Sequence, residues 1–200
     1  GEFLILAEAL LPIINGDYEI VNRYTGADLV GMTYQPVYSY FTDQVDKGEA
    51  WRVVAADIVS TDEGTGIVHM APAYGADDNA IGQREGLPLF NPIDADGCFT
   101  DAAPLVEGAW FKDADKDIIR DLKERGALYK QRTFLHNYPF DWRKGTPLMS
   151  YPVDSWFIRT TDIKDAMVER NQTINWQPDG IGTGRFGDWL ANNVDWALSR

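Results

Sequence analysis

Short apolar segments separated by turns fill the first 150 residues, and this spacing limits the folds that the chain can adopt. The segment WRVVAADIV at 51–59 is β-branched and mostly apolar, which predicts a buried strand. The turn TDEGTG follows at 61–66, and IVHMA at 67–71 predicts the next strand. A further strand is expected at 17–24, where apolar residues alternate, and Asp96-Gly97 predicts a hairpin. Such short strands favour a barrel-like arrangement.

Two helical patterns interrupt these strands. Residues 77–86 predict a short helix that has Asp77 or Asp78 in its first turn and ends at Gly86, and residues 113–126 give the clearest helix. The fold class expected is therefore α+β, with a β-barrel-like domain at 1–150 and a few peripheral helices. Residues 151–200 differ in composition and predict a second part, because four of the seven tryptophans fall there: Trp156, Trp176, Trp189 and Trp196.

Charge and composition exclude several classes of protein. The chain has 18 basic and 31 acidic residues, a net charge of −13, which argues against a dedicated nucleic-acid-binding domain and leaves room for a local basic patch. No apolar run approaches the roughly 20 residues of a membrane span, and the first residues lack the basic start of a signal peptide. The single cysteine, Cys98, excludes an internal disulfide and fits a cytoplasmic protein.

The stretch GTGIVHMAPAYGADD at 64–78 concentrates the residues that could carry chemistry. Its spacing matches neither a zinc motif nor a phosphate-binding loop, and no nucleophile motif is present in the sequence. Two interpretations remain. In the first, His69 is a hydrogen-bonded strand residue, and Asp77 and Asp78 cap a helix. In the second, a carboxylate binds a substrate ammonium while the imidazole contacts a hydroxyl or water. The residues alone favour the first interpretation and leave the second open.

The same stretch resembles the editing domain of isoleucyl-tRNA synthetases, an insertion in the catalytic core known as connective peptide 1. The form H-x-A-P-x-x-G-x-D-D favours the isoleucyl branch over the valyl and leucyl ones. The segments at 135–159 and 184–200 resemble the family's return into the Rossmann-type catalytic domain, to which 151–200 would belong. The resemblance implies hydrolytic editing of mischarged valyl-tRNA(Ile) in a pocket separate from the synthetic site. A valyl- or leucyl-type editing domain and a catalytically silent insertion are the alternatives.

The resemblance also implies roles for individual residues. Asp78 matches the aspartate that binds the α-amino group of valine, and His69 matches a histidine that lines the same pocket; these two are the catalytic candidates. Asp77 is assigned mainly to capping the helix, and the nucleophile is expected to be an ordered water. No metal or cofactor is expected here, because ATP and magnesium belong to the parent catalytic domain. The remaining substrate-binding candidates shape the turn and let the backbone approach the ligand: Gly64, Thr65, Gly66, Pro72, Ala73 and Gly75.

Three departures from the family pattern complete these expectations. The family's Thr-rich pocket wall is expected before Gly1, so the chain alone should be weakly active or inactive. Asp141 and Lys144 stand where many bacterial members have a cysteine pair. The ATP-binding motifs of the HIGH and KMSKS type are not in the sequence, which implies a part of a larger enzyme. The expected partners are the valine-bearing 3′ end of tRNA(Ile) and the rest of the synthetase chain, with no membrane and no DNA.

Overall fold

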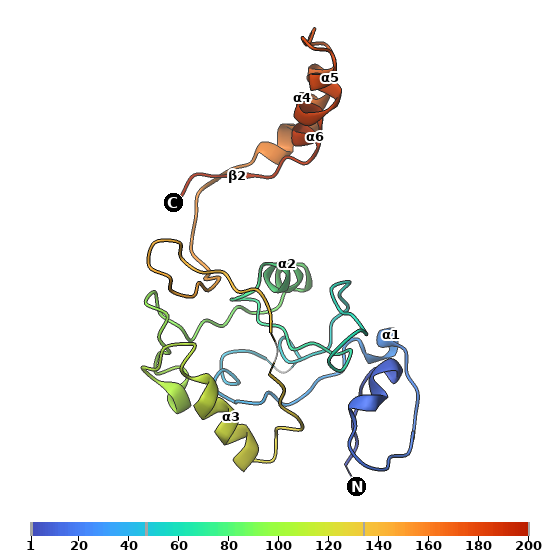
Figure 1. Cartoon of the computed structure of the whole chain (residues 1–200), viewed down its shortest axis with the longest axis vertical. Coiled ribbons are helices and arrows are strands. Elements are labelled where there is room, and N and C mark those ends of the chain that lie inside the picture. The colour runs from blue at the N-terminus through green and yellow to red at the C-terminus, as the bar shows by residue number, and fades with distance from the viewer. Residues whose placement is uncertain (1, 47, 134, 200) are drawn as a thin grey trace. The chain divides into compact units, whose positions relative to one another are not determined.

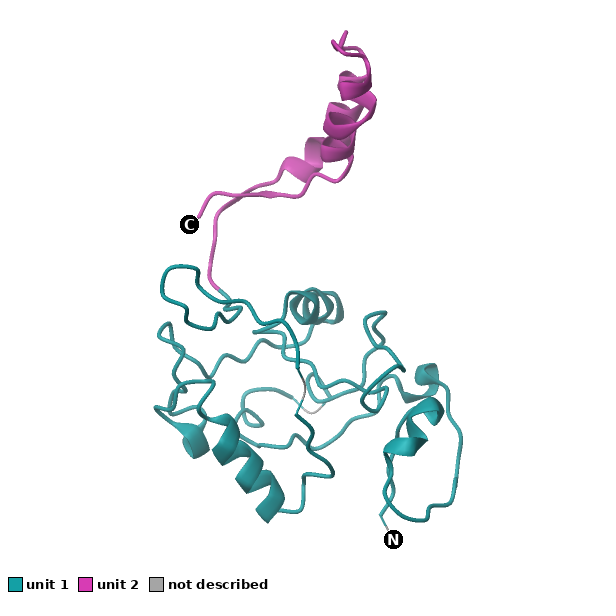
Figure 2. Cartoon of the chain, viewed as in Figure 1, with its two compact units in different colours: residues 1–152 teal, residues 153–200 magenta. Residues whose placement is uncertain are grey.

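The chain divides into two compact units, residues 1–152 and 153–200 (Figure 2). The structure is a computed structural model, and it describes residues 2–46, 48–133 and 135–199 (Figure 1). Gly1, the first residue of the predicted barrel-like domain, and Arg200, the last residue of the predicted return segment, lie outside the described residues. Within the described ranges, every helix is too short or too polar to cross a bilayer.

Helices account for most of the regular structure of the first unit. Both helices predicted there are confirmed, as α2 (Ala76–Glu85) and α3 (Asp115–Glu124). Each is followed by a glycine with positive φ, namely Gly86 at 65° and Gly126 at 65°. These ends are encoded locally, because glycine adopts the left-handed conformation without steric cost. In chain order the unit contains η1 (Glu8–Ile13), α1 (Gly26–Leu29), α2 (Ala76–Glu85), η2 (Pro104–Val106) and α3 (Asp115–Glu124).

The strands predicted for the first unit are wrong as regular elements. Residues 17–24 and 67–71 form no strand, and the 51–59 segment pairs through the single bridge between Thr33 and Arg52. Around that bridge Val53 N–H donates to the Met32 carbonyl at 2.9 Å. Further along the segment, Ile58 and Val59 are exposed, so this end is not the buried strand that was expected. Helices with short antiparallel bridges confirm the α+β composition, and the β-barrel-like arrangement stays a prediction.

The hairpin predicted at Asp96-Gly97 is confirmed. Asp94 N–H donates to the Cys98 carbonyl at 2.9 Å, and Gly97 has φ 81°. The Asp94 carboxylate also accepts the Cys98 N–H at 2.9 Å, so a side chain fixes the turn. A small core lies beside this hairpin. It consists of Ala103, Val106 and Ala114, the last 0% exposed, packed against Tyr40, Phe99, Ala109 and Ile118.

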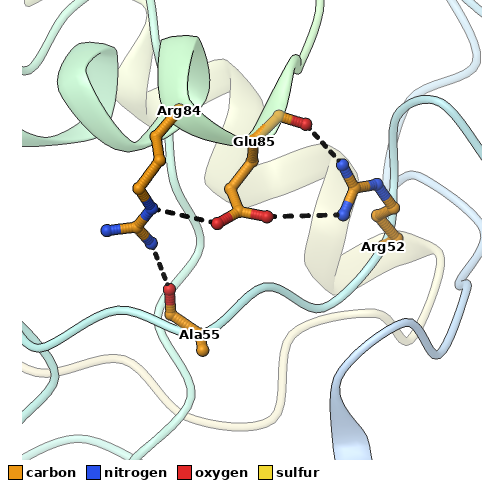
Figure 3. A network of polar contacts seen from close by, with 4 residues as sticks. All are labelled: Arg52, Ala55, Arg84 and Glu85. Atoms are coloured by element: carbon orange, nitrogen blue, oxygen red, sulfur yellow. Dashed lines mark hydrogen bonds and ion pairs between the residues drawn. The ribbon is translucent and has the colours of Figure 1, made fainter.

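Polar contacts attach the C-terminal end of α2 to the 52–55 segment (Figure 3). The Arg52 guanidinium donates to the Glu85 carbonyl at 2.7 Å and lies 3.9 Å from the Glu85 carboxylate. Arg84 donates to the Ala55 carbonyl at 2.6 Å and pairs with the same carboxylate at 3.0 Å. A cation near the last carbonyls of a helix also interacts favourably with its dipole. These contacts fix the helix whose first turn carries Asp77 and Asp78.

Replacing Arg52 with alanine is expected to lower the free energy of unfolding of the chain by about 1–2 kcal/mol, because a charged hydrogen bond to a helix end is lost. The Arg52 side chain is only 23% exposed, so solvent compensates little. Arg120→Ala is the control, since that side chain is 65% exposed and its ion pair with Asp117 should contribute under about 1 kcal/mol. Urea denaturation measures both. Equal losses in the two variants would contradict a specific role for Arg52.

A second turn that is fixed by a side chain lies near the end of the first unit, at residues 139–148. Phe140 and Pro147 form an antiparallel bridge, and Leu148 N–H donates to the Pro139 carbonyl at 3.0 Å. At the tip, the Asp141 carboxylate accepts the N–H groups of Arg143 and Lys144 at 2.9 and 2.6 Å. The Asp141 side chain therefore holds the turn through backbone hydrogen bonds.

The second unit is a small helical cluster with a two-stranded ribbon. Strands β1 (Phe157–Ile158) and β2 (Trp196–Ala197) pair antiparallel. Asn171 is 6% exposed, donates to the Gly182 carbonyl at 2.7 Å and accepts from the Trp176 indole at 3.0 Å, so it joins the helices. Thr161 donates twice to the Asp195 carboxylate, and these bonds lower the pKa of that carboxyl. The helical elements are η3 (Thr160–Ile163), α4 (Lys164–Asn171), α5 (Gly180–Thr183) and α6 (Arg185–Ala191).

Candidate functional site

The turn that opens the candidate site has the backbone that its glycines predict. Gly64 has φ 73° and Gly66 has φ 75°, so both occupy the left-handed region that disfavours other residues. Between them, the Thr65 hydroxyl donates to the Ile67 carbonyl at 2.9 Å, and the Thr65 carbonyl accepts the Ala7 N–H at 2.8 Å. A side chain at Gly66 would collide with the Cβ of Ala7 at 2.5 Å. This turn is therefore fastened to the N-terminal segment.

His69 follows this turn in an exposed position. Its imidazole makes no hydrogen bond with any residue in the described ranges, and residues 67–71 form no strand there. The interpretation of His69 as a hydrogen-bonded strand residue is therefore wrong, because no neighbouring segment pairs with it. An exposed imidazole is accessible to a substrate or to water. Among the described residues, no hydrogen bond or ion pair joins His69 to Asp78.

Asp78 is half-buried in the first turn of α2 and bonds back to the preceding loop. Its Oδ2 accepts the Ala71 N–H at 2.8 Å, and its negative charge suits the N-terminal end of a helix. A Cβ at Gly75 would lie 3.0 Å from the Asp78 carboxyl carbon, so glycine lets the carboxylate fold over the loop. The structure thus brings Asp78, Gly75 and Ala71 together.

Asp77 does not cap this helix as expected. The N-cap position belongs to Gly75, whose carbonyl accepts the Asn79 N–H at 2.8 Å, and α2 has no side-chain cap. Asp77 lies two residues beyond the N-cap position, and its side chain is exposed. Its negative charge still lies in the first turn, where the helix dipole is favourable.

The loop between His69 and α2 lies against the helix. Ala73 is buried, and Tyr74 N–H donates to the Ala71 carbonyl at 2.8 Å, which makes a tight turn. The Tyr74 hydroxyl donates to Asn91 at 2.7 Å, and burial raises the pKa of Tyr74 to about 12. Tyr74 also borders an open, largely apolar cavity of about 500 Å³, whose other lining residues include Ile93, Phe111, Lys112, Tyr138 and Leu148.

Sequence reasoning missed two contributors to this site. Tyr74 was not singled out, although a tyrosine inside a glycine- and proline-bounded loop is a candidate anchor. Asn79 was also missed; its amide donates to the Pro72 carbonyl at 2.9 Å, and its place directly after the paired aspartates was the available signal. As for metals, the ranges that the structure describes contain no group of three or more His, Cys, Asp or Glu residues arranged to hold an ion.

The arrangement offers a carboxylate at a helix start, an exposed imidazole and a glycine-shaped backbone, which suits an ammonium-bearing ligand. Residues 19–200 match the family model of class I tRNA synthetases (I, L, M and V). The chain therefore belongs to the class I tRNA synthetases.

Its relatives place it more narrowly. The chain is 47% identical over 200 residues to the isoleucine–tRNA ligase of Clostridium acetobutylicum and 46% identical over 204 residues to that of Bdellovibrio bacteriovorus, covering 100% of this chain and 19% of each relative. The isoleucine–tRNA ligase of Chlamydia pneumoniae is 45% identical over 184 residues, covering 92% of this chain and 18% of the relative. The resemblance to isoleucyl-tRNA synthetases is confirmed, and the chain spans 19% of the length of the first two relatives.

Proposed function

We propose that this chain is part of a cytoplasmic isoleucine–tRNA ligase and forms one side of a pocket that hydrolyses valyl-tRNA(Ile). The observation that carries the proposal is the Asp78 carboxylate, which is held by the Ala71 N–H through Oδ2. Its other oxygen, Oδ1, has no hydrogen-bond partner among the described residues and is left for a ligand. A charge-assisted hydrogen bond from an ammonium to a carboxylate is about twice as strong as a neutral one.

The chemistry of the reaction explains why an editing pocket is needed. Isoleucyl-tRNA synthetases are the established example of this need: one missing methylene gives only about 150-fold selectivity against valine, a value that belongs to the class, and a second, hydrolytic site follows. In the proposed pocket, Asp78 holds the α-ammonium of valine and His69 contacts the terminal ribose or the attacking water. Two segments shape the wall of this pocket. They are the glycine turn of Gly64, Thr65 and Gly66 and the loop through Pro72, Ala73 and Gly75.

The other partners follow from the same proposal. The substrate is the 3′ end of tRNA(Ile) bearing valine, and the rest of the synthetase chain supplies the remaining pocket wall and the synthetic site with its ATP and magnesium. Residues 151–200 would continue into the Rossmann-type catalytic domain. The net charge of −13 is consistent with most tRNA contacts lying elsewhere in the parent enzyme.

Binding of a non-hydrolysable valine-bearing adenosine analogue to the full-length parent enzyme tests the proposal. We expect the valine analogue to bind at least ~10-fold more tightly than its isoleucine counterpart, because the pocket excludes the larger side chain. Competition with the catalytic site is removed by saturating that site with an isoleucyl-adenylate analogue, and isothermal titration measures the affinities. Equal affinities, or no binding of either analogue, would contradict editing by this domain.

A further inference from the structure

Two consecutive side chains of α2 hold two consecutive residues of the preceding loop. Asp78 accepts the Ala71 N–H at 2.8 Å, and the Asn79 amide donates to the Pro72 carbonyl at 2.9 Å. One residue thus binds a backbone donor and the next binds a backbone acceptor. The two bonds flank the Ala71–Pro72 dipeptide and hold it against the first turn of the helix.

The Asn79 amide is itself oriented from one turn further along α2. Gln83 donates through Nε2 to the Asn79 Oδ1 at 2.9 Å. Because the oxygen of the Asn79 amide accepts this bond, its NH₂ group is directed to the Pro72 carbonyl. Gln83 is exposed, so this outer bond can be removed without opening a cavity.

Packing reinforces the same contact. Gly82 lies beneath Pro72, and a Cβ there would come within 3.0 Å of the proline ring. Ala73 is 7% exposed, which leaves the loop little room to move away from the helix. The position of the Ala71 N–H therefore depends on how the Pro72 carbonyl is held.

We propose that Asn79 is a positioning residue of the editing pocket. By holding the Pro72 carbonyl, Asn79 keeps the Ala71 N–H against Oδ2 of Asp78 and so sets the direction in which Oδ1 meets the substrate ammonium. The inference rests on the proposed function and adds a residue that does not touch the substrate. Gln83 contributes to the same geometry by orienting the Asn79 amide.

Steady-state hydrolysis of valyl-tRNA(Ile) by the full-length parent enzyme tests this role. Asn79→Ala should raise KM about 10-fold with kcat nearly unchanged, because the ammonium contact is made in the ground state as well as in the transition state. A merely structural role would lower the fraction of active enzyme, so kcat would fall at constant KM. Ala80→Ser, an exposed change at the next position of the helix, is the control and should alter neither constant.

Two further variants keep the inference falsifiable if Asn79→Ala does not fold. Gln83→Ala should raise KM in the same direction by about 3-fold, a smaller effect because the Asn79 donor remains. In the Asp78→Ala background, Asn79→Ala should cause no additional loss, since both changes act through the same carboxylate. An unchanged KM in both single variants, or fully additive losses, would overturn the role of Asn79. Wild-type enzyme that fails to hydrolyse valyl-tRNA would instead overturn the proposed function.

Discussion

Replacing Asp78 with alanine in the full-length parent enzyme is expected to slow valyl-tRNA(Ile) hydrolysis by about 100-fold, while isoleucine charging changes by less than about twofold. The variant would lose the proposed ammonium contact and also the acceptor of the Ala71 N–H, bonded at 2.8 Å. A charge-assisted hydrogen bond contributes about 1.5–3 kcal/mol, which corresponds to roughly 10–150-fold. Radiolabelled valyl-tRNA should accumulate when the variant charges tRNA(Ile) in the presence of valine.

Asp77→Ala is the matched control for this prediction. Asp77 carries the same charge one residue earlier, but it is exposed and α2 has no side-chain cap. Its removal should reduce hydrolysis by less than about threefold, because only a favourable interaction with the helix dipole is lost. Comparable losses in the two variants would show that net negative charge at the helix start matters, and not the placement of Asp78.

Gly66→Ala is expected to destabilise the chain by about 2–5 kcal/mol, the largest effect on stability among these variants. Two costs add at this position. A non-glycine residue at φ 75° costs about 1–2 kcal/mol, and the new methyl group would meet the Cβ of Ala7 at 2.5 Å, an overlap that costs about 1–3 kcal/mol. Urea denaturation followed by tryptophan fluorescence measures the loss.

Gly64→Ala separates the two costs. Gly64 has nearly the same φ, 73°, but no atom of the described residues lies within 4 Å of the position that a Cβ would take. Only the conformational cost of about 1–2 kcal/mol should therefore appear. Ala7→Gly combined with Gly66→Ala should recover the contact part and leave the conformational part. If Gly66→Ala and Gly64→Ala lose the same stability, the approach of Ala7 does not limit this turn.

Features that depend on neighbours in the sequence were predictable, and features that depend on distant partners were not. The ends of α2 and α3 at Gly86 and Gly126 follow from the left-handed preference of glycine, and the Asp96-Gly97 turn follows from the same property. The segment at 51–59 has strand-like residues, but its pairing is limited to the region of Thr33, which no local pattern indicates. Apolar periodicity identifies a potential strand without identifying its partner.

In the candidate site, too, local features were predictable and contacts between distant segments were not. The positive φ of Gly64 and Gly66 was expected from the turn sequence, whereas the contact of Gly66 with Ala7 joins segments far apart in the chain. The distinct environments of Asp77 and Asp78 depend on a loop that folds back on the helix, and no local pattern in the sequence indicates that contact. The prediction that Asp77 caps the helix was wrong because Gly75 occupies the N-cap position.

A carboxylate, that of Asp141, fixes the backbone at the tip of the turn at residues 139–148, and this affects how the turn responds to oxidants. At this turn a carboxylate, and not a thiol, accepts the N–H groups of Arg143 and Lys144 at 2.9 and 2.6 Å. A carboxylate is not oxidised by peroxide and forms no mixed disulfide. The backbone conformation of this tip is therefore held by a group that oxidation does not alter.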